Sequence, residues 1–180
     1  MGEERDPAVR IVDYDPGWPA EAARELRRVG EALDGVAVRL DHVGSTSVPG
    51  LAAKPIVDLQ VSVVEIAPAD RYVGPLEGLG YLFAADPDSP DFHFFGKPAA
   101  RPRTFHVHVC VAGSDDEFRH LALRDYLRAH TDEALRYAEV KRSLVALRPG
   151  DRLAYIEGKA DYVAALEERA VMFARGREKP

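Results

Sequence analysis

Apolar and polar side chains alternate along two segments of the chain, and this alternation predicts two β-strands. In residues 56–63, valine and leucine take every second position, and the intervening side chains include Asp58. In residues 104–111, phenylalanine and valine alternate with a set that includes His106 and His108. Because successive side chains of a strand point to opposite faces, each strand has an apolar face for the core and a second face with groups that ionise or bind.

Elsewhere the apolar residues return every three or four positions, which is typical of helices packed on a core. This spacing predicts helices over residues 19–33 and 68–79 and throughout the last third of the chain. Ser114, with Glu117 three residues later, matches a capping box, in which each side chain binds a free backbone N–H of the first turn. Thr131 is expected to cap the helix that follows.

Shorter segments complete the predicted sheet. Residues 36–43 are rich in β-branched and apolar side chains and predict a strand. Residues 81–83 and 92–95 predict a strand pair, joined by a turn-rich segment at 86–91. Residues 51–54 are expected to form a short helical turn, because a proline follows them.

The order of these elements predicts a single α+β domain. Strands gather in residues 9–113 and helices occupy residues 114–176, within one domain that spans residues 1–180. We expect a mixed sheet with helices on one face, followed by a helical C-terminal third. The helical spacing near the end of the chain is expected to break at Gly158.

Length, composition and charge exclude several classes of protein and of binding partner. The chain has 180 residues, which fits one domain, and its 46% hydrophobic and 30% charged residues are typical of globular proteins. The formal net charge of -6 argues against duplex DNA as the main partner, since proteins that bind a phosphate backbone carry a basic face. The N-terminal residues form no apolar signal segment. No run reaches the ~18 apolar residues that a membrane-spanning helix needs. The sequence has one cysteine, Cys110, which excludes an internal disulfide. We therefore expect a cytoplasmic protein that binds no membrane.

The loop after the first predicted strand has the composition of a phosphate-binding turn. It contains Gly44, Ser45, Thr46 and Ser47 in sequence, and Lys54 follows. Glycine lets the backbone approach a ligand, successive N–H and hydroxyl groups bind phosphate oxygens, and the lysine neutralises their charge. The loop is not a Walker A motif, because no Gly-Lys-Ser/Thr ends it. The alternative interpretation is a tight turn of small residues with the lysine on the surface.

Side chains that can hold a metal lie on the two strands with alternating patterns. Asp58 is a candidate ligand and catalytic residue for a divalent cation such as magnesium or manganese. His106 and His108 point to one face, and together with Asp58 and with His42, at the end of its strand, they form a candidate site that also suits zinc. One of these histidines is also a candidate general base near neutral pH. The alternative is that the two histidines fill a half-exposed sheet face.

Lys141 follows Tyr137 by one helical turn, beside an otherwise apolar stripe. From this position it is a candidate to reach a bound phosphate. The alternative is a surface lysine whose apolar stem covers the helix, and the sequence favours that alternative.

Taken together, these motifs resemble the GrpB-like family of predicted nucleotidyltransferases, distant relatives of the polymerase-beta superfamily. The marks of the resemblance are residues 42–51, 53–58, 106–109, 137–141 and 158–160. They are spread over most of the chain. The resemblance implies a nucleotidyltransferase-like fold and binding of a nucleoside triphosphate or another phosphorylated small molecule, with a divalent metal.

The sequence also departs from the superfamily pattern, in which two acids two residues apart and a third on a neighbouring strand hold two magnesium ions. Asp58 is present, but Gln60 takes the second position, and His106 and His108 stand where an acid is expected. Three hypotheses follow: a nucleotidyltransferase with a modified metal site, a catalytically inactive module that binds a nucleotide or another anion, and a metal-dependent phosphoester hydrolase that uses the His/Asp cluster.

The run His106-Val-His108-Val-Cys110-Val also resembles the motif of histidine-triad hydrolases, which attack nucleotide phosphates with a histidine. In this chain the third histidine of that motif is replaced by cysteine. The missing histidine argues against this family.

Overall fold

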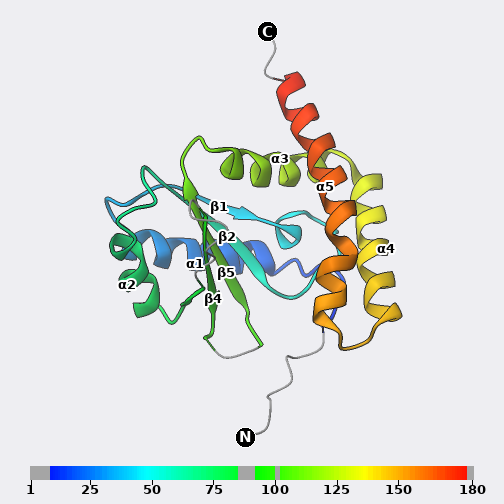
Figure 1. Cartoon of the computed structure of the whole chain (residues 1–180), viewed down its shortest axis with the longest axis horizontal. Coiled ribbons are helices and arrows are strands. Elements are labelled where there is room, and N and C mark those ends of the chain that lie inside the picture. The colour runs from blue at the N-terminus through cyan, green and yellow to red at the C-terminus, as the bar shows by residue number, and fades with distance from the viewer. Residues whose placement is uncertain (1–8, 85–91, 100–101, 178–180) are drawn as a thin grey trace, which may run out of the picture.

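The computed structural model describes residues 9–84, 92–99 and 102–177 and contains a five-stranded sheet between helices (Figure 1). The helices are α1 (Trp18–Ala32), α2 (Asp70–Gly78), α3 (Asp115–Ala129), α4 (Thr131–Leu147) and α5 (Arg152–Arg177). The strands are β1 (Ala37–Val43), β2 (Val57–Val63), β3 (Leu82–Ala84), β4 (Phe92–Lys97) and β5 (Phe105–Val111), and a 3-10 turn, η1 (Ser45–Ser47), follows β1. This mixed architecture agrees with the α+β class that the sequence predicts.

The sheet has the order β1-β2-β5-β4-β3. β2 and β5 are parallel, and the other neighbouring pairs are antiparallel. In the parallel pair Asp58 lies opposite His106 and Gln60 lies opposite His108. The register of this one pair therefore brings the predicted acid and the two histidines to the same face of the sheet.

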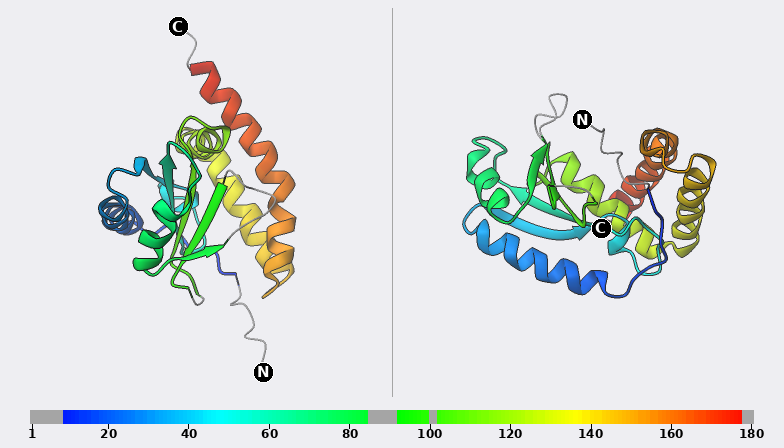
Figure 2. Two further views of the ribbon diagram at one scale, coloured as in Figure 1. Left: turned by 60° about the vertical axis from the view of Figure 1, so that its left-hand side comes forward. Right: turned by 90° about the horizontal axis from the view of Figure 1, so that it is seen from below.

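The apolar face of the sheet forms the main core, as the alternation predicts. Leu59, Val61, Val107 and Val109 have no exposed surface, and they belong to one buried cluster with apolar residues of α1 and α2. Figure 2 shows α1 along this face of the sheet.

The prediction of helices on one face only is wrong, because α3 crosses the second face (Figure 2). Gln60 and Ser62, which point to that face, are 0% exposed. The Ser62 hydroxyl donates to the carboxylate of Glu117, and the amide oxygen of Gln60 lies 2.7 Å from Nδ1 of His120, both from α3. These two residues of β2 are thus buried, and the Ser62 hydroxyl and the Gln60 amide oxygen find partners on the helix, whereas the Gln60 amide nitrogen has none among the described residues.

The capping box at the start of α3 is confirmed in part. The backbone N–H of Glu117 donates to Oγ of Ser114 at 3.3 Å, as the motif predicts. The carboxylate of Glu117, however, accepts from the backbone N–H of Gly113 at 2.7 Å and from Ser62 rather than from the N–H of the cap itself. The side chain therefore joins the helix both to the sheet and to Gly113, the residue before the cap.

Three local predictions differ from the structure. Residues 51–54 form no helical turn, because Ala53 pairs with Val12 in an isolated antiparallel bridge. Thr131 is the first residue of α4, and the cap position is taken by His130. α5 continues through Gly158, where a Cβ atom would lie 2.7 Å from Cδ2 of Leu144 in α4, so this glycine permits close packing of two helices. The turn predicted at 86–91 lies outside the described residues.

A second apolar cluster joins the helical third to the loop after β1. It includes Val48 and Leu51 of the loop, Ala138 of α4 and Leu166 of α5. α4 and α5 therefore stand side by side at the end of the sheet where this loop lies (Figure 1). None of the described helices has the length and apolar character to cross a membrane.

Candidate functional site

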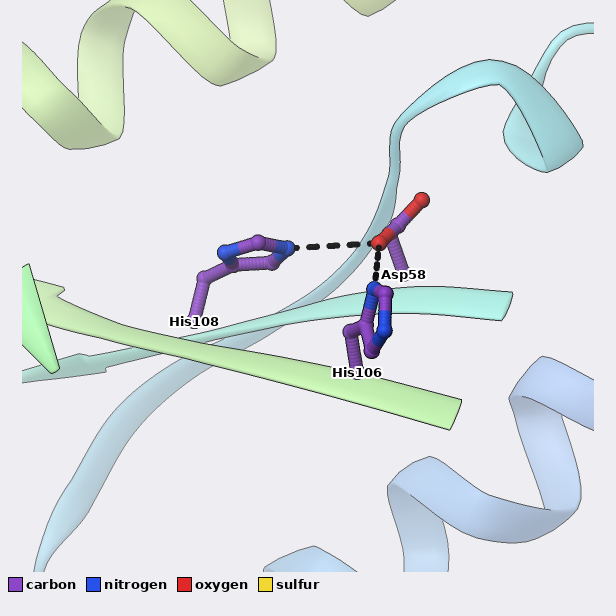
Figure 3. Close-up of side chains that lie close together, drawn as sticks. All are labelled: Asp58, His106 and His108. Carbon is purple, nitrogen blue, oxygen red and sulfur yellow. Dashed lines mark hydrogen bonds and ion pairs between the residues drawn. The ribbon is translucent and has the colours of Figure 1, made fainter. Parts of the chain in front are cut away.

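Asp58 of β2 and His106 and His108 of β5 meet on the face of the sheet opposite the main core. Figure 3 shows both imidazole rings directed at one carboxylate oxygen: Oδ1 of Asp58 lies 3.0 Å from Nδ1 of His106 and 3.3 Å from Nε2 of His108. One ligand atom from each residue lies within 4.8 Å of the others. The three residues are thus close enough to share one ion.

Burial and hydrogen bonding act in opposite directions on this cluster. Burial disfavours the carboxylate of Asp58, yet the hydrogen bonds from the two imidazoles hold its pKa well below the usual value. Burial lowers the pKa of His106, against the attraction of Asp58. The acid is therefore ionised, and His106 favours the neutral form that binds metals.

The donor set fits a transition metal better than magnesium. Imidazole and carboxylate together are common ligands of zinc, iron and nickel, whereas magnesium prefers oxygen ligands alone. In this cluster two of the three ligand atoms are imidazole nitrogens. Asp58, His106 and His108 would hold such an ion.

His42, the fourth predicted ligand, is not part of this cluster. Its Nε2 lies 3.0 Å from the hydroxyl of Thr46, and burial lowers its pKa to about 4. Its ring therefore supports the loop after β1.

This loop lies directly on the carboxylate of Asp58. Gly44 has φ +67 and ψ -172, and a Cβ atom there would be 2.6 Å from Oδ2 of Asp58. Gly44, Ser45 and Thr46 line a cavity beside Asp58, whereas the hydroxyl of Ser47 donates to the backbone carbonyl of Gly44 at 2.6 Å. Three of the four residues of the predicted phosphate turn thus reach the cavity, and the fourth fixes the shape of the turn.

The cavity has a volume of about 300 Å³ and is lined by residues far apart in the sequence. β2 and β5 contribute the His/Asp cluster, and the loop after β1 contributes Gly44 and Lys54. α4 contributes Tyr137 and Lys141, and α5 contributes Tyr155 and Lys159. One hollow therefore contains both the candidate metal ligands and several cations.

Lys141 is buried in the wall of this cavity, so the expectation of a surface lysine is wrong. Its side chain is 2% exposed, because α4 packs against the loop after β1. Nζ donates to Oγ of Ser45 at 3.0 Å and to the carbonyl of Ala52 at 2.5 Å, and it lies 4.3 Å from the ring centre of Tyr137. Burial, together with repulsion from Lys159 and Lys54, lowers the pKa of Lys141 to about 7.

The other two lysines of the cavity flank Tyr155. Nζ of Lys54 lies 6.0 Å from the ring centre and Nζ of Lys159 lies 5.6 Å from it. Burial lowers the pKa of Lys159, against the attraction of the carboxylates of Asp58 and Glu167. Such a wall favours a negatively charged ligand. The sequence signal for Lys159 is its place in a segment that resembles the GrpB-like family.

His120 of α3 also lines the cavity, although it is not among the site residues predicted from the sequence. Its ring centre is 5.4 Å from that of His108, and burial lowers its pKa to about 4. The available signal is its spacing: His120 lies one helical turn after Glu117, on the side of α3 that faces the sheet.

Cys110 lies on β5 but does not line the cavity. It is fully buried, and burial raises the pKa of its thiol to about 11. The thiol is therefore protonated at neutral pH, which disfavours a nucleophilic role.

The family model for "GrpB protein" matches residues 8–169. The chain belongs to the GrpB family. It is 40% identical to a UPF0157 protein of Pseudomonas aeruginosa over 94% of this chain and 71% of that protein. It resembles the crystal structure of the conserved protein GrpB from Enterococcus faecalis with a TM-score of 0.84 and 30% identity, over 92% of this chain and 99% of that one.

This GrpB-family chain also matches part of some longer proteins. It is 35% identical to a dephospho-CoA kinase of Mycolicibacterium paratuberculosis, over 90% of this chain but only 46% of that protein. The similarity therefore covers less than half of the kinase.

Proposed function

We propose that this chain binds a nucleoside triphosphate, or another phosphorylated small molecule, together with a divalent metal, and that it transfers a nucleotidyl group. The observation that carries the proposal is the cavity, which joins the loop at Gly44 and Ser45, the buried Lys141 and the Asp58 cluster in one space. Anion-binding and metal-binding groups in the same hollow are the pairing that phosphoryl chemistry requires.

In the proposed reaction the residues of the cavity have separate roles. Gly44 lets the ligand approach the backbone, and Ser45, Lys54 and Lys141 bind phosphate oxygens. Asp58, His106 and His108 hold the metal, which when bound polarises a phosphate oxygen and stabilises the charge that develops in the reaction. A phosphate beside Lys141 also removes the cost of a buried cation without a counter-ion.

Gln60 supports a one-metal arrangement for this reaction. In the superfamily that the chain resembles, an acid at this position contributes to a two-metal site. Here the side chain is fully buried against α3 and does not line the cavity.

The second candidate function is metal-dependent phosphoester hydrolysis, favoured by the imidazole ligands, which suit a metal that activates water. The third is a module that binds the anion without catalysis, favoured by the withdrawal of Gln60 from the cavity.

The similarity to dephospho-CoA kinases adds one ligand to the candidates. The kinase activity belongs to those longer proteins, of which this chain matches under half. Dephospho-CoA carries phosphate groups on a nucleotide, so it fits the same class of ligand. We include it beside the nucleoside triphosphates in the test.

The proposal predicts a ligand-dependent gain in stability that needs Asp58. We expect one phosphorylated ligand, with zinc, manganese or magnesium, to raise the melting temperature of the wild type. At a hundred times its Kd a ligand adds ~2.7 kcal/mol to the free energy of unfolding. Asp58→Asn removes the carboxylate charge and is expected to abolish the metal-dependent part of the shift. Thermal melting of both proteins with each ligand and metal measures this.

The matched control is Asp70→Asn, an exposed acid in the first turn of α2, away from the cavity. It should keep the full shift. The proposal is wrong if no phosphorylated ligand raises the melting temperature, or if Asp58→Asn responds as the wild type does. Release of pyrophosphate in the presence of an acceptor distinguishes transfer from binding alone.

A further inference from the structure

The hydrogen bond between His120 and Gln60 indicates a role for each of these two residues. The amide oxygen Oε1 of Gln60 can only accept a hydrogen bond, and it lies 2.7 Å from Nδ1 of His120. Nδ1 must therefore carry the proton, and Nε2 keeps its lone pair. A histidine that binds a metal typically has this arrangement, with one ring nitrogen donating to an oxygen and the other left for the ion.

His120 also lies at the right place for such a role. His106 and His108 converge on one oxygen of Asp58 although their ring centres are 6.3 Å apart. The rings of His108 and His120 are closer, at 5.4 Å, and both line the cavity. The ligand atoms that lie within 4.8 Å of one another come from Asp58, His106 and His108, so the ring of His120 would move toward this group to share its ion.

We propose that His120 is a further ligand of the metal held by Asp58, His106 and His108, and that Gln60 is the positioning residue that fixes its ring. The inference rests on the metal site of the proposed function. It explains the departure of Gln60 from the acid of the superfamily pattern: glutamine is one methylene longer than aspartate and reaches α3, and its neutral oxygen orients the imidazole without adding charge.

The extended ligand set selects the class of metal. Three imidazoles and one carboxylate suit zinc, cobalt, nickel or iron, whereas magnesium binds such a set poorly. The rings of Phe92 and Phe94 pack beside the histidines. The ring centre of Phe92 lies 5.7 Å from that of His120, and the ring centre of Phe94 lies 4.8 Å from that of His106. This apolar shell limits access of water and strengthens metal–ligand interactions.

Metal titration of purified full-length protein tests the proposal without any activity measurement. Zinc affinity is measured by competition with a chelator, and the visible absorption of bound Co²⁺ reports the ligand set. We expect the wild type to bind one ion. Gln60→Met is close in size to glutamine but accepts no strong hydrogen bond, and it is expected to weaken zinc binding ~10–100-fold. His120→Ala should weaken it at least as much and change the Co²⁺ spectrum.

Gln60→Glu is the rescue variant, because it keeps an acceptor oxygen for Nδ1 of His120. It also removes the amide N–H, which has no partner in the described part of the chain. We expect near wild-type zinc affinity from this variant. His93→Ala, a histidine on the other side of the sheet against Tyr72, controls for loss of an unrelated imidazole and should bind zinc normally.

The outcomes separate this inference from the proposed function. If His120→Ala and Gln60→Met, both folded by circular dichroism, keep the zinc affinity and the Co²⁺ spectrum of the wild type, His120 is not a ligand. Loss of zinc in His106→Ala would then still support the three-residue site. If the wild type binds neither zinc nor Co²⁺, both the inference and the transition-metal site are wrong. Failure of Gln60→Glu to rescue would overturn the positioning role of Gln60.

Discussion

Gly44→Ala is expected to destabilise the protein by roughly 2–4 kcal/mol, because backbone strain of ~1–3 kcal/mol adds to a steric clash. The pair φ +67 and ψ -172 belongs to a region that is essentially restricted to glycine. The new Cβ would also meet Oδ2 of Asp58 at 2.6 Å and its Cβ at 3.0 Å. Either the loop or the carboxylate must move, and we expect metal and ligand binding to fall with stability.

Urea unfolding, with zinc titration of the same samples, measures both effects of Gly44→Ala. Gly50→Ala is the matched control, since Gly50 also has a positive φ, +79, but a Cβ atom added there would meet nothing within 4 Å. The control should lose stability from strain alone and keep its zinc affinity. Equal losses in the two variants would mean that the contact with Asp58 adds nothing.

Lys141→Met is expected to weaken binding of the phosphorylated ligand by about 10–150-fold, since a hydrogen bond to a charged group contributes ~1.5–3 kcal/mol. Methionine keeps much of the apolar stem and removes the cation. Among the described residues no carboxylate pairs with Lys141, so its charge is left for the ligand. Isothermal titration of both proteins with the best ligand of the thermal screen measures the loss.

The pH dependence gives this prediction a second, independent signature. The pKa of Lys141 is about 7 in the folded protein against an ordinary value of 10.5. Between these two values the unfolded chain binds a proton that the folded protein does not, so this group makes stability rise with pH. Below pH 7 its full penalty is present. The stability of the wild type relative to Lys141→Met should therefore increase between pH 7 and 10.5.

Ligand affinity is expected to change with pH in the opposite direction. As pH rises above 7, Lys141 loses its proton and the wild type should bind the anion less tightly, whereas Lys141→Met should lack this step. Arg142→Met is the control, because Arg142 is the neighbouring cation on α4 and pairs with Asp13 on the surface. It should bind the ligand as the wild type does. An affinity for the ligand that is unchanged in Lys141→Met would exclude Lys141 from the binding site.

The parts of the fold that the sequence predicts correctly are those set by local patterns. Alternation along residues 56–63 and 104–111 identifies the buried face of each strand, because the period of two follows from strand geometry alone. The parallel register of β2 and β5 is not local. It joins residues 48 positions apart, and no pattern within either strand states that Asp58 lies opposite His106.

The errors have the same physical origin. The sequence places Lys141 on the surface because its own helix shows only a cation beside an apolar stripe, and the loop that covers it comes from 96 positions earlier. The sequence alone assigns no role to His120, because nothing within α3 states which distant residue its ring meets. It is a cavity residue because α3 crosses the second face of the sheet and Gln60 meets its ring. Tertiary contacts between distant segments decide both positions.

The cavity wall formed by α5 has a consequence for the cooperativity of the whole protein. In this helix of 26 residues Tyr155, Leu166 and Ala170 are buried, and others, among them Val163 and Phe173, pack partly buried on the second apolar cluster. The elements of a protein can open locally, each with its own free energy. A ligand that spans from Lys159 to the sheet would link such opening events to unfolding of β2 and β5. Occupancy of the cavity would then slow amide hydrogen exchange along α5, and the bound molecule would act as a structural cross-link for the C-terminal third.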